Sequence, residues 1–232
     1  RSFASRREDR LLDAELLGGL RRLAGGMGIS LFSLLAGCFA MLLSRLSGQR
    51  EIVIGVPVAG QPGAGMASLV GHCVNLLPLR ILVDPDAPAS SALSAVQSSL
   101  LDALDHQHYT FGTLLRRLRI ARDPKRIPLI GVMFNFGRSV SLEQFERAGL
   151  RVEMSAVPRH YEGFELFLNA GQKGDALQFE CQYNTDLFAT QTVNQWLDGY
   201  ETLLRAVLAA PQLPVGELPV LDARHGARLS AW

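Results

Sequence analysis

The sequence contains few residues that could hold a disulfide framework or a structural metal. Its three cysteines, Cys38, Cys73 and Cys181, are odd in number, lie far apart and form no CxxC pair. Disulfide-rich secreted domains and structural zinc sites both need cysteines at paired or repeated spacings. We therefore expect neither a disulfide framework nor a zinc site, and a reducing, cytoplasmic location.

The sequence also lacks the motifs of self-sufficient catalytic sites. None of its five histidines is adjacent to another, and no HExxH spacing occurs, so metal catalysis has no support. The GxSxG motif of a serine nucleophile, the P-loop and the GxGxxG dinucleotide-binding pattern are missing as well. The residues alone predict a protein without a complete catalytic group.

No apolar run reaches the length that a membrane span needs. The longest, residues 29–43, is interrupted by Ser30, Ser33 and Gly37 and is shorter than the roughly 20 residues required. The first ten residues, RSFASRREDR, contain no apolar signal-peptide core and no initiator Met. We expect a core helix at residues 29–43, and a chain that begins inside a longer polypeptide.

Charge and composition narrow the class further. A net charge of +1 gives no field that would attract nucleic acid or an anionic membrane, so neither is an expected partner. The hydrophobic share of 48% and the charged share of 19% exclude intrinsic disorder. With 232 residues, the chain can form one large domain or two small ones.

Apolar periodicity predicts an α/β protein with a mixed β-sheet covered by helices. Helices are expected at residues 13–24, 30–47, 90–106, 114–118 and 190–210, and strands at 52–58, 73–80, 129–136, 164–168 and 177–183. The last two strands are expected to form a hairpin. The start of the chain is expected to be irregular, residues 140–154 to hold a helical turn and an edge strand, and residues 184–186 to cap the last helix.

Two structural units are expected, a domain at residues 1–210 and a linker at residues 211–232. The boundary is placed at Pro211, because proline, glycine and arginine follow it without helical or strand order.

The chain is organised around residues 51–80, in which two strand-like runs flank a loop rich in glycine and proline. Asn75 lies inside the second run, and a buried amide there needs hydrogen-bond partners. It either pins the loop backbone or faces a binding channel. His106 and His108 close the third helix, and they either cap it or line a site.

Several segments, in this order, form a recognisable set. They are IGVPVAG at 54–60, VGHCVNLLPLR at 70–80, HQHYTF at 106–111, RDPKRIPL at 122–129, VMFN at 132–135, YNTDLF at 183–188 and GELP at 216–219. From about residue 15 to 225 the chain resembles the C-terminal subdomain of a nonribosomal peptide synthetase condensation domain. The resemblance implies one half of a chloramphenicol acetyltransferase-like two-subdomain fold.

The resemblance implies amide-bond formation between an acyl or peptidyl donor and an aminoacyl acceptor, each tethered to a carrier protein. The phosphopantetheine arm of each carrier protein holds the substrate, and no cofactor is bound directly. The implied partners are the N-terminal condensation subdomain, the donor and acceptor carrier proteins and a following adenylation domain. In the family the reaction takes place near a histidine of an HHxxxDG motif in the other half. That motif is absent here, so the chain alone is expected to be inactive.

The resemblance also assigns positions around a substrate tunnel between the two halves. Residues 58–73 are expected to form a floor loop under the tunnel, and the hairpin at 164–183 to cross onto the partner subdomain and expose apolar surface. The chain itself supplies no catalytic residue and no metal ligand. The expected channel residues are Pro57, Gly71, His72, Asn75, His108 and Asn135.

Besides the amide-forming condensation domain, which is the first hypothesis, two alternatives stay open. The family usually has Asp at the position of His108, Pro at Thr110 and Glu at Gly112, and these departures leave the subtype undecided. The segment VMFNFG at 132–137 also resembles epimerisation or dual-function relatives. The third hypothesis is a non-catalytic module that recruits a carrier protein or an accessory enzyme.

Overall fold

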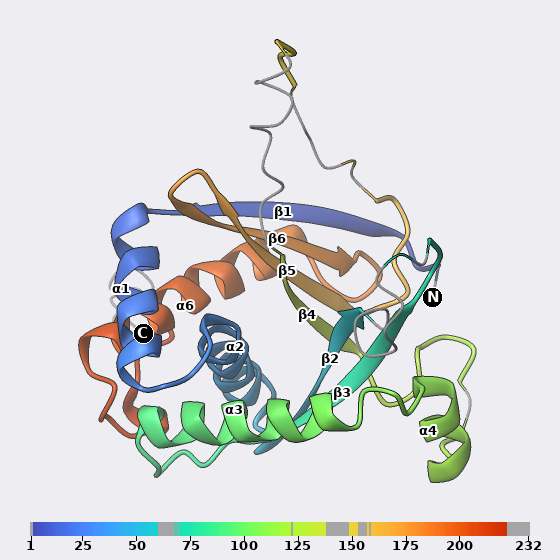
Figure 1. Ribbon diagram of the computed structural model, residues 1–232, viewed down its shortest axis with the longest axis horizontal. Helices are drawn as coiled ribbons and strands as arrows, with labels where there is room; N and C mark the ends of the chain where they lie inside the picture. The colour runs from blue at the N-terminus through green and yellow to red at the C-terminus, as the bar shows by residue number, and fades with distance from the viewer. Residues whose placement is uncertain are drawn as a thin grey trace.

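The protein folds into one mixed β-sheet with helices packed against it (Figure 1). The computed structural model describes residues 2–59, 68, 70–121, 123–137, 149–152, 157 and 159–221. Within these residues the sheet has six strands in the order β1-β6-β5-β4-β2-β3. The strands are β1 Ser5–Leu12, β2 Glu51–Ala59, β3 Val74–Leu82, β4 Val132–Gly137, β5 Leu166–Lys173 and β6 Ala176–Asn184. The helices are α1 Ala14–Gly26, α2 Leu31–Ser47, α3 Ala89–Asp105, α4 Phe111–Leu118, α6 Thr190–Ala209 and the short 3₁₀ helix η2 Val215–Glu217.

The two faces of the sheet differ in what covers them. Strand β4 runs parallel to both β2 and β5, whereas the other pairs are antiparallel. Side chains alternate along each strand, so every strand gives one row to each face. Helices α1, α2, α3 and α6 pack on one face, and α4 lies beside the end of β3 (Figure 1). We call the other face the open face; it carries Arg7, Met133, Asn135, Phe167, Asn169, Glu180 and Gln182. The predicted fold class is confirmed.

A chain of aromatic rings joins the helices to the sheet. Neighbouring ring centroids are 5.4, 5.8, 5.7 and 4.9 Å apart. The rings are, in order, Phe32, Phe134, Phe39, Tyr200 and Phe179. The Tyr200 hydroxyl donates a 2.8 Å hydrogen bond to the Leu35 carbonyl, and burial raises the pKa of Tyr200 well above its usual value. The core therefore keeps α2 and α6 at fixed positions over β4 and β6.

The helix ends follow the local signals in the sequence. The Asp13 carboxylate accepts the Leu16 N–H at 2.7 Å, and the Ser30 hydroxyl accepts the Ser33 N–H at 3.1 Å. Gly48 ends α2 with a φ of 71°, the left-handed conformation that glycine adopts without strain. The two capping side chains confirm the predicted starts of α1 and α2, and the backbone of Gly48 confirms the predicted end of α2.

The predicted cap of the last helix is wrong. The Asn184 side chain accepts the Asp186 N–H at 3.0 Å, which closes a local turn. Helix α6 begins at Thr190, after Ala189, whose side chain makes no capping bond. Asparagine side chains often bond to nearby backbone and close a turn. The Asn184 side chain does so here, and it therefore does not cap helix α6.

The expectation of an irregular start is also wrong. Residues Ser5–Leu12 form edge strand β1, which pairs with β6 along its whole length. Its charged residues hid the strand signal, but charges are well suited to the edge of a sheet. On the helix-facing side, Arg10 reaches the Asp198 carboxylate of α6 at 2.7 Å. An ion pair thus takes the place of the apolar contact that the prediction looked for.

The hairpin at residues 164–183 forms as predicted, and its crossing onto a partner subdomain stays a prediction. Strand β5 pairs with β4, and β6 pairs with β1, so both lie inside the sheet. Their helix-facing side chains, such as Leu168 and Phe179, are fully buried. The turn that joins the two strands contains Gly174, which has a φ of 58°. Most of residues 140–154, including the predicted edge strand, lies outside the described residues.

The first part of the predicted linker packs against the domain. Val215 and Leu218 are buried, and the Arg45 guanidinium donates to the Gly216 carbonyl at 2.7 Å. A Cβ on Gly199 of α6 would lie 2.6 Å from the Val220 carbonyl oxygen, so the tail lies directly on that helix. The expectation of a tail without order is therefore corrected for residues 211–221, whereas residues 222–232 lie outside the described residues. The division into a domain and a linker stays a prediction.

No single helix in the described part of the chain is long and apolar enough to cross a membrane. Helices α1 and α2 meet the length and composition criteria only as a pair, and the pair is bent by 104°.

The buried Tyr200 hydroxyl gives a stability prediction. We expect Tyr200→Phe to lower the free energy of unfolding by about 1 kcal/mol, because one net buried hydrogen bond is lost. Tyr200→Ala should cost about 3–5 kcal/mol, because it also leaves a cavity among the rings. Urea denaturation measures both. Tyr161→Phe is the control, since Tyr161 is exposed; an equal loss in that variant would contradict the assignment.

The cysteines give a second prediction. Burial raises the pKa of the Cys38 and Cys181 thiols to about 12, whereas Cys73 is half-buried near the end of the glycine-rich loop. Since the thiolate is the reactive form, a chromogenic disulfide reagent at about pH 8 should titrate one thiol per native chain. In guanidinium it should titrate all three. The Cys73→Ser variant should react only after denaturation, and rapid native reaction of that variant would show this burial pattern to be wrong.

Candidate functional site

Polar side chains form a line across the open face. The registers of β4, β5 and β6 place Asn135 beside Asn169, and Asn169 beside Glu180. Asn135 Nδ2 donates to Asn169 Oδ1 at 2.8 Å, and Asn169 Nδ2 donates to Glu180 Oε2 at 3.0 Å. A nitrogen of Arg7 on β1 lies 3.6 Å from Glu180 Oε1. We call Arg7, Glu180, Asn169 and Asn135 the polar row.

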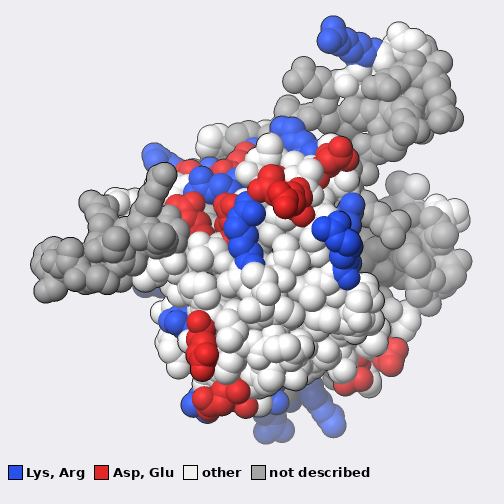
Figure 2. Space-filling model, turned by 90° about the vertical axis from the view of Figure 1, so that its left-hand side faces the viewer, with Lys and Arg blue, Asp and Glu red and all other residues white. Residues whose placement is uncertain are grey.

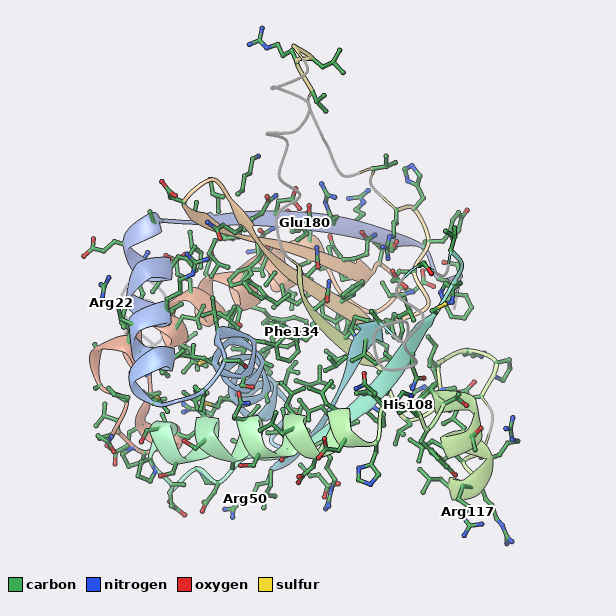
Figure 3. The ribbon with its side chains drawn as sticks, viewed as in Figure 1. Arg22, Arg50, His108, Arg117, Phe134 and Glu180 are labelled. Carbon is green, nitrogen blue, oxygen red and sulfur yellow. The ribbon has the colours of Figure 1, made fainter. Side chains whose placement is uncertain are left out.

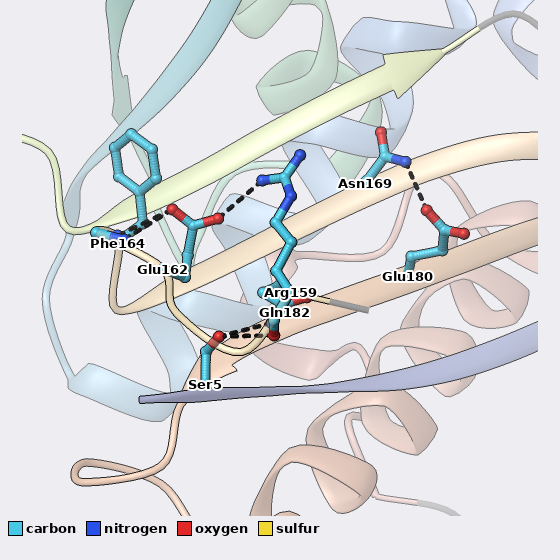
Figure 4. A network of polar contacts seen from close by, with 8 residues as sticks. Ser5, Arg159, Glu162, Phe164, Asn169, Glu180 and Gln182 are labelled. Atoms are coloured by element: carbon cyan, nitrogen blue, oxygen red, sulfur yellow. Dashed lines mark hydrogen bonds and ion pairs between the residues drawn. The ribbon is translucent and has the colours of Figure 1, made fainter. Parts of the chain in front are cut away.

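A second set of contacts closes one side of this line (Figure 4). Gln182 Nε2 donates to Ser5 Oγ at 2.8 Å and to the Arg159 carbonyl at 2.7 Å. The Arg159 guanidinium pairs with Glu162 at 2.9 Å and lies 5.7 Å from the centre of the Phe167 ring. These bonds hold the segment before β5 against the ends of β6 and β1.

The polar row lies in a groove. The groove consists of two hollows. The larger one has a volume of about 360 Å³, within the range of small-ligand sites. It is lined by Arg7, Asn135, Val157, Arg159, Phe167, Asn169, Glu180 and Gln182. A smaller hollow of about 170 Å³ beside it is also lined by Asn169 and Glu180 and extends to Gly137 and Gly171. Asn169 and Glu180 therefore belong to both hollows.

The groove is suited to binding and orienting a ligand. Its lining offers amides, one carboxylate and two guanidinium groups, all of which form hydrogen bonds. No cysteine, serine or histidine lines it, so the described lining supplies no nucleophile with a base beside it. The described residues also contain no group of three or more His, Cys, Asp or Glu that could hold a metal ion.

Asn75 lies elsewhere and has a structural role. Its Nδ2 donates to the carbonyls of Gln107 and Tyr109 at 2.8 and 3.1 Å, and its Oδ1 accepts the Phe111 N–H at 3.1 Å. Its amide therefore pins backbone, as one of the two interpretations held, and its place in a channel stays a prediction. The pinned segment, however, is the connection between α3 and α4 and not the glycine-rich loop. One side chain thereby links the VGHCVNLLPLR and HQHYTF motifs.

Asn75 and Asn135 belong to opposite faces of the sheet. Asn75 is paired with Val58, which shares the helix-covered row of β2 with Ile54. Val132 is paired with Ile54, so Asn135, three residues later, points to the open face. The sequence could not separate the two asparagines, because each lies in an apolar run whose register is set by its neighbours.

The other predicted channel residues lie near one end of β2 and β3. Pro57 is half-buried in the open-face row of β2, opposite Leu76. Gly71 and His72 are exposed just before β3, and His108 is exposed in the connection between α3 and α4 (Figure 3). Residues 60–67 and 69, most of the predicted floor loop, lie outside the described residues. The role of these four residues in a channel stays a prediction.

Sequence reasoning missed Arg7, Asn169, Glu180 and Gln182. The available signal was the alternation of polar and apolar residues in QFECQY at 178–183, which marks a strand with one polar face. Figure 3 shows Glu180 on the side of the sheet away from the helices, whereas Phe134 points between sheet and helices. On the face seen in Figure 2, acidic and basic side chains are intermixed among the described residues, and no basic patch is seen.

Curated relatives are long peptide synthetases. The chain is 37% identical over 207 residues to tyrocidine synthase 3 of Brevibacillus parabrevis, a match that covers 89% of the chain and 3% of that protein. It is 30% identical over 222 residues to bacitracin synthase 2 of Bacillus licheniformis, a match that covers 96% of the chain and 8% of that protein. The chain thus spans less than a tenth of these relatives.

Solved structures share the fold. A four-domain nonribosomal peptide synthetase bound to AMP and glycine matches with a TM-score of 0.86 and 24% identity, over 97% of this chain and 18% of that one. The condensation domain of the monacolin K polyketide synthase MokA matches with a TM-score of 0.81 and 18% identity, over 93% of this chain and 49% of that one. The family model described as Condensation domain matches residues 1–230. Since that match runs over almost the whole sequence, the chain belongs to the condensation domain family of nonribosomal peptide synthetases.

Proposed function

We propose that this chain is the C-terminal half of a condensation domain, which forms an amide bond between a tethered acyl or peptidyl donor and an aminoacyl acceptor. The proposal is supported by its extent, because the chain spans 49% of the MokA condensation domain and 50% of the X-domain from teicoplanin biosynthesis. It is also supported by the open face, which no described helix covers. A second half that packs toward this face would turn the groove into part of a tunnel.

The observation that carries the proposal is a groove with hydrogen-bonding side chains and no described nucleophile with a base beside it. In amide formation the amine attacks the thioester carbonyl, a carbon–nitrogen bond replaces the carbon–sulfur bond, and the proton that the amine loses passes by way of a base to the departing thiolate. Most of the chemical change takes place within the substrates, so a wall that orients them contributes by proximity. The base is expected in the HHxxxDG motif of the other half.

The partners in this proposal are the N-terminal subdomain, a donor and an acceptor carrier protein, and an adenylation domain after the chain. The carriers' phosphopantetheine arms bring both substrates, and this chain binds no cofactor of its own. The proposed location is the cytoplasm, supported by cysteines that are buried or isolated from one another.

A second candidate is a recruitment module without catalytic activity. It is favoured by one neighbour, the teicoplanin X-domain in its complex with OxyB, which matches with a TM-score of 0.83 and 19% identity. That likeness concerns the fold. A recruitment module would use an outer surface, whereas the condensation proposal places function in the groove of the open face.

The first prediction from this proposed function compares the whole condensation domain with this chain alone. With carrier-bound donor and acceptor, the whole domain should give amide product by mass spectrometry, and the chain alone should give none above background. Changing the second histidine of the partner half's HHxxxDG motif to alanine should abolish product. Turnover by the chain alone would contradict the half-domain proposal, and the absence of condensation in the whole domain would favour the recruitment module.

The second prediction separates the two asparagines. Asn75→Ala should lower the free energy of unfolding by about 1–3 kcal/mol, because three backbone groups lose their hydrogen-bond partner. It should also speed amide hydrogen exchange at Phe111. Asn135→Ala in the whole domain should change stability by less than about 1 kcal/mol, but should lower the condensation rate.

Denaturation, hydrogen exchange and rate measurements on the same two variants test this assignment. A stable Asn75→Ala protein, or an Asn135→Ala domain with unchanged rate, would count against it.

A further inference from the structure

Hydrogen-bond chemistry determines how each amide of the polar row is oriented. Glu180 carries a carboxylate, which accepts hydrogen bonds and cannot donate them. The Asn169 atom 3.0 Å from Glu180 must therefore be Nδ2, and its other terminal atom, Oδ1, faces Asn135. The Asn135 atom 2.8 Å from that oxygen must in turn be Nδ2. Each amide is oriented by its neighbour, starting from one negative charge.

We call the hydrogen-bonded series from Glu180 through Asn169 to Asn135 the relay. Its last atom is the Asn135 amide oxygen. No described residue donates a hydrogen bond to it, although Asn135 is half-buried and lines the larger hollow. A carbonyl oxygen in that position accepts a hydrogen bond from a ligand. Without the carboxylate, either amide could turn over and present N–H groups to the groove instead.

The charges around the groove narrow the ligand further. Its lining contains the guanidinium groups of Arg7 and Arg159 and one carboxylate, that of Glu180. Arg7 also pairs with Asp9 at 2.9 Å, and Arg159 pairs with Glu162. Each charge of the lining already has a partner of opposite sign, Glu180 included, so no unpaired carboxylate is left to bind an ammonium ion. A neutral N–H donor is the group that suits both the charge and the free oxygen.

We propose that Glu180 is a positioning residue that acts through Asn169 to present the Asn135 oxygen to a neutral N–H donor of the substrate. The proposal rests on the proposed function for its ligand class. In that reaction two neutral N–H donors are available, the amides of a pantetheine arm and the uncharged amine of the acceptor. Glu180 touches neither; it sets which atom of Asn135 they meet.

The test compares each N–H ligand with an analogue that lacks those donors, using the whole condensation domain that contains this chain. Calorimetry measures the dissociation constants of pantetheine and of an analogue whose amide N–H groups are replaced by ester oxygens. In the unchanged domain we expect pantetheine to bind about tenfold more tightly, the worth of one good hydrogen bond. In Glu180→Gln the ratio should fall to about one, because a neutral amide no longer fixes the relay.

The ratio separates positioning from damage to the fold, since general damage weakens both ligands together. Glu162→Gln is the matched control: it changes a carboxylate beside the same groove that makes no bond to Asn169 or Asn135. Its ratio should stay near tenfold. Asn135→Ala should abolish the preference, and it keeps the test decisive if Glu180→Gln does not fold.

The second arm uses glycinamide above the pKa of its amine, with methoxyacetamide as its partner ligand, because an ether oxygen accepts hydrogen bonds but cannot donate one. A preference for either N–H ligand that disappears in Glu180→Gln supports the relay and says which donor it meets. An unchanged ratio in Glu180→Gln, or no preference for either N–H ligand in the unchanged domain, would overturn it. Because binding needs no turnover, this result is independent of the condensation assay.

Discussion

The buried contact between the helix layer and one face of the sheet determines the rest of the structure. Its centre is the row of rings that includes Phe134, Phe39 and Tyr200, with the Tyr200 hydroxyl bonded to a carbonyl of α2. Burial of these rings contributes much of the packing energy of the layer, and the hydroxyl bond permits one arrangement of α2 and α6. Once Phe134 points into that layer, alternation along β4 directs Asn135 to the other face.

The division of work between the two faces follows from this constraint. The helix-covered face supplies stability, and the open face supplies a groove whose polar groups are held by the strands themselves. Side chains on strands keep their spacing better than side chains on loops. The strands therefore hold the side chains of the relay, from Glu180 to Asn135, at hydrogen-bonding distance. The same face, uncovered by described helices, is where a second half of the domain is proposed to lie.

Local signals predicted much of the fold. Apolar periodicity predicted the helices, and the hairpin and both strands around the glycine-rich loop were found. Failures arose where local and tertiary preferences compete. β1 is a charged strand stabilised by pairing with β6, and the turn at Asn184 used a helix-capping residue for another purpose. The backbone-pinning role of Asn75 was foreseen, but the segment that it holds was not.

The sequence by itself determined the class, the helices, most strands and the family, because these depend on periodicity and on short motifs that are read along the chain. Tertiary structure decided which strands are neighbours, and with them the site. Asn135, Asn169, Glu180 and Arg7 lie far apart in sequence and become one polar row through the registers of four strands. Those registers depend on long-range backbone pairing and on which face the helices bury, and neither is encoded within a local window.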